Sequence, residues 1–144
     1  SLESGSVQEF DLGSELQSLI ETYREVSPLR MTINVAPGVA ALVTNEEKRE
    51  VLMIVREAMS NCVRHARAAH AAISLYARGS HLRLLIADDG VGFAQEDHDR
   101  KGYGLANMAA RAKKVGGRLL IRSQIGRGTR ILVEFELEPG LSPA

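Results

Sequence analysis

Apolar residues recur along this 144-residue chain with two different periods, and the order in which those periods follow one another limits the folds open to it. Segments with a helical spacing of three to four residues cover 12–23, 44–66 and 105–115. Segments typical of β-strands cover 31–35, 72–77, 82–87, 118–123 and 129–137. The resulting order of helix, strand, helix, strand, strand, helix, strand, strand lacks the strict alternation of a doubly wound sheet. It predicts an α/β fold of the α+β kind, a two-layer sandwich with a mixed, mostly antiparallel sheet and helices packed on one face.

Capping residues and glycines mark where several of these segments begin or end. Thr44 and Glu47 form the T-x-x-E pattern of a capping box, in which each side chain binds a backbone N–H group of the other residue. The longest helix is therefore predicted to begin there. The turn 78–80 contains glycine and joins two strands into a predicted hairpin, and 126–128 is the predicted turn before the last strand.

Composition favours one globular domain and excludes several function classes. Lys and Arg number 18 against 18 Asp and Glu, and without the net positive charge that duplex binding needs we expect no nucleic acid partner. Cys62 is the one cysteine, which excludes an internal disulfide and a multi-cysteine zinc site. Because neither a secretory signal nor an apolar run of about 20 residues is seen, we expect a cytoplasmic domain. We place that domain at 11–138, after a flexible segment at 1–10 and before a tail at 139–144.

The predicted long helix carries a column of polar residues, because Glu57, Asn61 and His65 are spaced four apart and therefore one turn apart. The column lies beside the apolar face, so the helix can pack and still present it. Two interpretations are open at this point. The column is either part of a solvated face, or a site at which a carboxylate and an amide oxygen hold Mg²⁺, a hard cation that prefers oxygen ligands.

Three glycine-rich stretches are candidates for binding a ligand. Asp88 ends a predicted strand and begins Asp-Asp-Gly-Val-Gly-Phe, where glycines allow close approach to the backbone and the aspartate can accept a hydrogen bond from an amino group. Gly102 and Gly104 lead into the third helix, whose N-terminal N–H groups can bind an anion. The third stretch is Gly-Arg-Gly-Thr at 126–129. A tight acidic turn explains the first equally well, and a hairpin turn explains the last.

In this order the four motifs resemble the Bergerat ATP-binding fold, which sensor histidine kinases, Hsp90, DNA gyrase B and MutL share. They correspond to the N box, the G1 box, the G2 box and a closing Gly-Thr element. The segment 56–66, Arg-Glu-Ala-Met-Ser-Asn-Cys-Val-Arg-His-Ala, resembles the N box of the sensor kinases that act on NarL-type regulators, a group with NarX-, DegS- and DesK-like members. The G2 region at 104–117 is similar to that of the same group. The resemblance covers residues 11–137.

The resemblance implies a site for Mg·ATP or Mg·ADP and a role for each motif residue. Asn61 would ligate Mg²⁺ directly, and Glu57 would hold it through water or polarise a nearby group. His65, the third residue of this catalytic set, would lie near the phosphates or shape the pocket. Asp88 would accept a hydrogen bond from the adenine amino group, with Thr129 beside it through water. The residues that would admit the nucleotide or contact its phosphates through the backbone are Gly90, Gly92, Gly102, Gly104 and Leu105.

The resemblance also implies that the chain is the catalytic domain of a longer enzyme, a protein histidine kinase. None of its four histidines lies in a phosphoacceptor motif, so we expect this fragment to bind ATP as a monomer without phosphorylating itself. In a homodimeric parent, the γ-phosphoryl of Mg·ATP would pass to a histidine of the enzyme's own dimerisation domain and then to a NarL-type response regulator. Anchoring of that parent in the inner membrane is compatible with this expectation.

A short lid over the nucleotide is a further implication. Residues 95–101 are consecutive polar residues with few apolar anchors, so ordering them without a ligand would cost entropy that nothing offsets. We therefore expect the stretch 93–101 to become ordered on the γ-phosphate. Lys101 lies where the group often has histidine, and its expected partner is either the γ-phosphate or solvent.

Two other functions remain open. An anti-sigma-factor serine kinase shares the fold and an N box with asparagine, but Met108, Arg111 and the glycines at 116–117 favour the sensor kinase. A nucleotide-binding regulatory module without catalysis is the second, and the presence of Glu57 and Asp88 weighs against it. A self-contained ATPase like Hsp90 is disfavoured, since the predicted lid is too short to close over the nucleotide.

Overall fold

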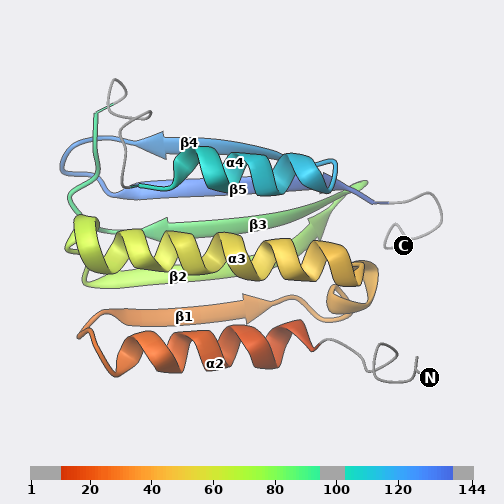
Figure 1. Cartoon of the computed structure of the whole chain (residues 1–144), viewed down its shortest axis with the longest axis horizontal. Helices are drawn as coiled ribbons and strands as arrows, with labels where there is room; N and C mark the ends of the chain where they lie inside the picture. Colours follow the sequence, from red (N-terminus) through yellow and green to blue (C-terminus); the bar gives the residue numbers. More distant parts are fainter. Residues whose placement is uncertain (1–10, 95–102, 138–144) are drawn as a thin grey trace.

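The computed structural model describes residues 11–94 and 103–137, which form a layer of helices on a five-stranded sheet (Figure 1). The α-helices are α2 (Leu12–Arg24), α3 (Asn45–Asn61) and α4 (Leu105–Lys114). A 3₁₀ turn, η1 (Ala40–Leu42), precedes α3, and a π-helical turn, η2 (Cys62–Ala66), continues it. The strands are β1 (Arg30–Val35), β2 (His70–Arg78), β3 (His81–Asp88), β4 (Arg118–Ser123) and β5 (Thr129–Glu136). No helix within the described ranges is long and apolar enough to cross a bilayer.

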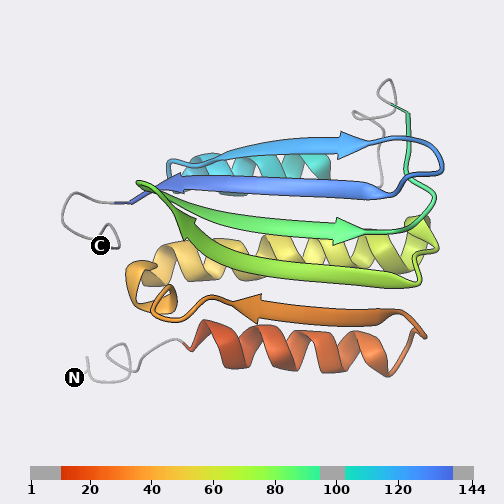
Figure 2. The same cartoon turned by 180° about the vertical axis from the view of Figure 1, so that it is seen from behind.

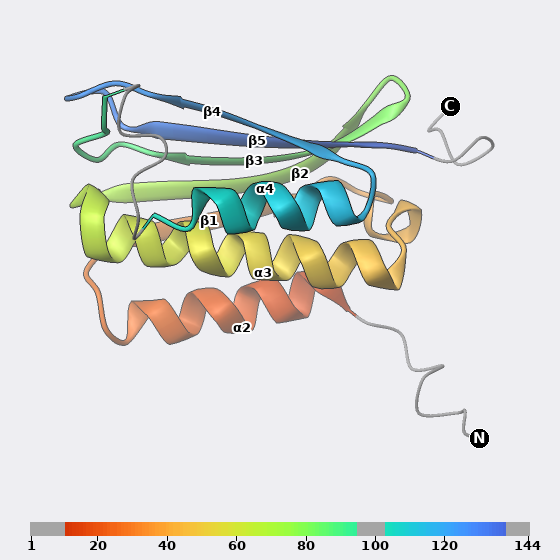
Figure 3. The same cartoon turned by 45° about the horizontal axis from the view of Figure 1, so that its top comes forward.

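The sheet has the strand order β1-β2-β3-β5-β4, with β1 parallel to β2 and the other neighbouring pairs antiparallel. Figure 2 shows one face of this sheet bare, and Figure 3 shows α2, α3 and α4 side by side along the other face. The predicted two-layer sandwich is therefore confirmed. Asp88, at the end of β3, pairs in register with Thr129, at the start of β5, so these two predicted site residues lie at the same edge of the sheet.

The core lies between the helix layer and the sheet, and α3 supplies its centre. Its buried apolar residues, each at most 2% exposed, are Val51, Ile54, Val55, Ala58 and Met59. Opposite them, β3 and β5 turn alternate residues inward: Leu82, Leu84, Ile86, Ile131, Val133 and Phe135. Full burial of such a side chain contributes about 1.5–3 kcal/mol, so this interface is a main source of stability.

The two ends of α3 differ. At its N-terminus, the Thr44 hydroxyl accepts the Glu47 N–H at 3.1 Å and the Glu47 carboxylate accepts the Thr44 N–H at 2.9 Å, which confirms the predicted capping box. At the other end the helix widens into η2, which ends at Arg67 with φ +50°. A π-turn holds an additional residue and so re-aims the side chains that follow Asn61.

On the bare face of the sheet, some arginines form ion pairs and others have no ion-pair partner among the described residues. Glu134 is only 6% exposed there, because Arg83 and Arg118 bind its carboxylate at 2.7 and 2.8 Å. The hydrogen bonds from Arg118 and Arg83 hold the pKa of Glu134 below its usual value. Further along, Arg122 of β4 lies directly opposite Arg130 of β5, and neither has an ion-pair partner within the described ranges.

A buried carboxylate joins α3 to α4. Glu50 is 5% exposed on the core side of α3, and it pairs with Arg111 at 3.1 Å and with Lys114 at 3.3 Å. Burial by itself would raise the pKa of Glu50, but the hydrogen bonds from Arg111 and Lys114 outweigh burial and hold that pKa below its usual value. The ion pairs therefore stabilise the packing of α4 only while Glu50 is ionised.

The variant Glu50→Gln tests this link through its pH dependence. Because the folded-state pKa is depressed, the stabilisation is present above the unfolded pKa of about 4.3 and is lost as pH falls through the folded value. We expect urea unfolding at pH 7 to show a loss of roughly 1.5–3 kcal/mol, the range for hydrogen bonds to a charged group, with parent and variant converging near pH 3. Glu46→Gln, at an exposed position of the same helix, is the matched control. An equal loss at both pH values would contradict the role of the charge.

Candidate functional site

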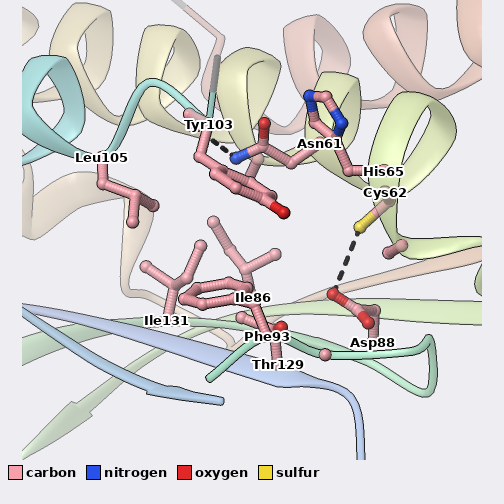
Figure 4. A pocket seen from close by; sticks show the side chains of 13 residues that line it. Asn61, Cys62, His65, Ile86, Asp88, Phe93, Tyr103, Leu105, Thr129 and Ile131 are labelled. Atoms are coloured by element: carbon pink, nitrogen blue, oxygen red, sulfur yellow. Dashed lines mark hydrogen bonds between the residues drawn. The ribbon is translucent and has the colours of Figure 1, made fainter. Parts of the chain in front are cut away.

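A small cavity lies where the end of α3 meets the edge of the sheet formed by the end of β3 and the start of β5 (Figure 4). Its volume is about 30 Å³. The residues that line it are Ala58, Asn61, Cys62, His65, Ala66, Ile86, Asp88, Gly92, Phe93, Tyr103, Leu105, Thr129 and Ile131. Two residues of the polar column, Asn61 and His65, therefore meet residues of the segments that follow β3, precede α4 and begin β5.

Two consecutive aspartates after β3 have opposite environments. Asp88 lines the cavity, where its carboxylate accepts the Gly90 N–H at 2.8 Å and the Cys62 thiol at 3.5 Å. Burial raises the pKa of Asp88, and it also raises the pKa of Cys62, which keeps the thiol protonated as a donor. Asp89 is exposed, and hydrogen bonds from the backbone and the ring of His70 lower its pKa to about 2. The fold thus disfavours the charge of Asp88 and stabilises that of Asp89.

The loop after β3 and the turn between β4 and β5 approach each other closely at two glycines. Gly92 has φ +66° and Gly128 has φ +76°, a region that residues with a side chain rarely adopt. A Cβ at Gly92 would overlap the Gln124 carbonyl oxygen, and a Cβ at Gly128 would overlap that of Asp88. Glycine is therefore required at both positions for the two loops to approach, and this approach keeps Asp88 beside Thr129.

Ser123, which belongs to none of the sequence motifs, joins these loops from the buried end of β4. Its Oγ accepts the Phe93 N–H at 2.8 Å and donates to the Gly128 carbonyl at 3.1 Å. Because its one hydroxyl proton is then used, the Thr129 hydroxyl donates to Ser123 across 2.7 Å. Thr129 Oγ1 consequently keeps acceptor capacity for a further partner at the cavity.

Asn61, the last residue of α3, has its amide fixed in one orientation. Its Nδ2 donates to the backbone carbonyl of Tyr103, while its Oδ1 is buried without a hydrogen-bond partner among the described residues. An acceptor left in this way costs about 1–3 kcal/mol, so a ligand at this atom would be favoured. Mg²⁺ fits, because it binds oxygen and keeps several water molecules. The described residues hold no cluster of three or more acidic, His or Cys side chains suited to a metal, so such a cation would rely on Asn61, water and a bound anion.

Glu57 lies beside the cavity rather than in its lining. Its carboxylate packs so closely against Gly104 that a Cβ at Gly104 would overlap it. Gly104 is the N-cap residue of α4 and provides no side-chain cap. A carboxylate is stabilised at the positive end of a helix dipole, so Glu57 is held at the start of α4. Leu105, the first residue of α4, is buried in the cavity wall.

Tyr103 fills much of the space between the helix and the sheet at this site. Its ring centroid lies 4.7 Å from that of His65 and 5.0 Å from that of Phe93. Figure 4 shows the Tyr103 ring between the side chains of Asn61 and His65 on one side and those of Ile86 and Phe93 on the other. No role for Tyr103 could be predicted from the sequence, since a single aromatic residue between two glycines belongs to no periodic pattern.

Most of the predicted site residues come together at the cavity: Asn61, His65, Asp88, Gly92, Leu105 and Thr129. Glu57 and Gly104 contact each other next to it. Gly90 is not part of the lining, and a Cβ there would overlap the Ala66 carbonyl oxygen, so it packs the loop against η2. Two parts of the prediction lie outside the described residues: Gly102, and residues 95–101 of the predicted lid, which include Lys101.

Known proteins similar to this chain include several sensor histidine kinases. The sensor histidine kinase LiaS of Bacillus subtilis is 30% identical over 124 residues, which are 86% of this chain and 34% of that protein. The nitrate/nitrite sensor protein NarQ of Escherichia coli is 29% identical over 137 residues, which are 94% of this chain and 24% of that protein. The chain therefore spans about a quarter to a third of the length of these relatives.

Solved structures show the same fold. The histidine kinase AdeS of Acinetobacter baumannii superposes with a TM-score of 0.73 at 20% identity, over 90% of this chain and 66% of that one. The sequence pattern of the family described as histidine kinase-, DNA gyrase B-, and HSP90-like ATPases matches residues 46–139, which include every residue that lines the cavity. This chain therefore belongs to the family of histidine kinase-, DNA gyrase B- and HSP90-like ATPases.

Proposed function

We propose that this chain is the ATP-binding catalytic domain of a two-component sensor histidine kinase. The observation that carries the proposal is a pair of groups on one cavity in a chain of this ATPase family. They are the buried Oδ1 of Asn61, which has no hydrogen-bond partner among the described residues, and the half-buried carboxylate of Asp88. The first suits Mg²⁺, and the second suits an amino group. The sensor kinases among the relatives favour a histidine kinase over other members of the family.

Adenine recognition is assigned to Asp88. Its carboxylate accepts hydrogen bonds only, so it pairs with the amino group of adenine and meets a second acceptor, the carbonyl oxygen, in guanine. The free acceptor capacity of Thr129 next to Asp88 supports a water-mediated contact to the same base. Apolar walls from Ile86, Ile131 and Leu105 suit the faces of a purine.

Phosphate binding is assigned to the other end of the site, where α3 meets the start of α4. Asn61 Oδ1 would hold Mg²⁺, with Glu57 acting through water, and the ion would offset the charge of the phosphates. The backbone N–H groups at Gly102, Gly104 and Leu105 would meet the phosphate oxygens, as at other helix N-termini. His65, in contact with Tyr103, shapes the site between the two ends.

Phosphoryl transfer by this domain would rest on position and charge more than on covalent chemistry. The bond from the γ-phosphorus to the bridging oxygen breaks as a bond to a histidine nitrogen forms, and ADP leaves. Of the three described histidines, His65 packs on Tyr103 and His70 is paired with Asp89. His81 begins β3, at the end of that strand opposite to Asp88, so none of the three is set in line behind a γ-phosphate at this site. We place the acceptor histidine in a dimerisation domain outside this chain.

The partners follow from that placement. A homodimeric parent would bring its acceptor histidine to this domain, which by itself is a monomer, and would pass the phosphoryl group to an aspartate of a response regulator. The similarity to NarQ favours a regulator of the NarL type. The domain would act in the cytoplasm, including in a parent anchored in the inner membrane.

Two neighbouring carboxylates provide a matched test of adenine recognition. Asp88→Asn should weaken ADP binding by about 1.5–3 kcal/mol in calorimetric titration with Mg²⁺, because a charged acceptor is lost. The raised pKa of Asp88 means that its ionised form destabilises the fold at neutral pH, so the same variant should unfold at a higher temperature at pH 7.

Asp89→Asn should have the opposite effect on thermal stability and no effect on ADP binding. The pKa of Asp89 is lowered to about 2, so its charge stabilises the fold from above the unfolded pKa upward, and that stability is lost as pH falls towards 2. At pH 7 this variant should unfold at a lower temperature and still bind ADP as the parent does. Normal ADP binding by Asp88→Asn would refute the assignment of the base contact, and absence of ADP binding in every protein, parent included, would refute the proposed function.

Labelling with γ-³²P-ATP tests whether this chain binds ATP while the acceptor histidine lies in another domain. The chain alone should bind ATP and retain no acid-labile label, whereas addition of a separate dimerisation fragment from a cognate kinase should give a labelled fragment. Asn61→Ala should abolish that labelling because it removes the Mg²⁺ ligand, and Asn34→Ala, exposed on β1, should leave it unchanged. Stable label on the isolated chain would show that the acceptor lies within it.

A further inference from the structure

The cavity is too small for the ligand that its walls suit. A volume of about 30 Å³ admits roughly two water molecules, whereas pockets for small ligands usually measure about 300–1,000 Å³. The walls that suit a purine are nonetheless in place, with Asp88 and Thr129 at one end and apolar side chains around them. What fills the space between those walls is a side chain of the protein itself.

That side chain is Tyr103. Its ring points into the site in Figure 4 and is flanked by other rings, with centroids 4.7 Å away at His65 and 5.0 Å away at Phe93. A flat aromatic ring held by ring contacts between apolar walls offers the site the same kind of surface as a nucleobase would. Tyr103 is also tied to the metal end, because its backbone carbonyl accepts the hydrogen bond from Asn61 Nδ2.

We propose that the Tyr103 ring occupies the place of the adenine base and competes with it, so that nucleotide binding displaces Tyr103 and the strength of its ring contacts sets the affinity. The inference rests on the proposed function. It adds an element of regulation to the same site: each aromatic contact that holds Tyr103 inward lowers the fraction of molecules able to bind, and the apparent dissociation constant rises in proportion.

The competition also links the two ends of the site. Asn61 cannot keep its hydrogen bond to Tyr103 if the backbone moves with the ring, so displacement by a base would free the Asn61 amide to turn. His65 takes part through its contact with the ring, which gives it a role in holding Tyr103 rather than in contacting phosphate. Tyr103 is thus a positioning residue for Asn61 as well as a competitor for the base.

Three variants separate this competition from a direct contact with nucleotide. Tyr103→Ala should bind Mg·ADP roughly 4- to 140-fold more tightly than the parent, and with faster association, because two ring contacts are lost and each is worth about a two- to twelve-fold change. Tyr103→Phe keeps the ring and should bind as the parent does. Tyr76→Ala, on the bare face of β2, is the matched control for loss of a tyrosine and should also leave binding unchanged.

Nuclear Overhauser effects between the ring protons of Tyr103 and Phe93 give a second readout that needs no substitution. They should be present in the protein alone and disappear when Mg·ADP saturates it. Weaker binding by Tyr103→Ala would show that the ring contacts the bound nucleotide, and unchanged binding would show that it does not compete; either result overturns the inference. If no protein binds ADP, Tyr103→Ala included, the proposed function itself fails, whereas binding by Tyr103→Ala alone would support strong competition.

Discussion

The core-facing side of an amphipathic helix can present polar groups to a ligand only where the elements packed against it end, and α3 is such a helix. It lies between α2 and α4 and against the sheet, and its inward face is apolar and at most 2% exposed from Val51 to Met59 (Figure 3). Beyond Met59 the helix reaches the edge of the sheet, and there Asn61 and His65 line a cavity. The position of the site is thus a consequence of where the core stops.

The polar groups at that edge are held in states that cost free energy. Asn61 Oδ1 lacks a partner among the described residues, and Asp88 carries a raised pKa because it is partly buried. The fold compensates for this cost elsewhere, through ion pairs such as those of Glu50 and Glu134, which lower the pKa of each carboxylate. The carboxylates that stabilise the fold are therefore different from the one that we propose binds the ligand, and Asp89 and Asp88 show this division within one dipeptide.

The order and type of the elements could be predicted from the sequence, because periodic apolar residues, a capping box and glycine turns are local signals. The parallel pairing of β1 with β2 could not, since it depends on which strand edge remains free after the hairpin forms. Glu50 was missed for a related reason: a charged residue on a core-facing position is explained only by Arg111 and Lys114, which come from another helix.

At the site, residues that belong to a spaced motif could be predicted from the sequence. Residues whose role is to connect segments that are distant in the sequence could not. Asn61, Asp88 and Thr129 belong to motifs, so their meeting at one cavity could be expected. Ser123 connects two loops through its one hydroxyl group, and Tyr103 fills the space between helix and sheet. Neither role corresponds to a recognisable spacing of residues in the sequence. Such roles depend on contacts between distant segments, and only the folded chain contains them.

Arg122 and Arg130, which have no ion-pair partner among the described residues, have a consequence for the behaviour of the protein at high concentration. Leu120, 46% exposed, and its register partner Leu132 form an apolar strip on that face, which another copy of the chain could cover. Next to this strip, Arg122 and Arg130 face each other as like charges, an arrangement that sheets normally avoid. If the bare faces of two molecules approached with these arginines aligned, the arginines would repel each other. The positive charge of Arg122 and Arg130 thus weakens the pairing of β4 with β5 within one molecule and also opposes the stacking of its sheet on the sheet of another.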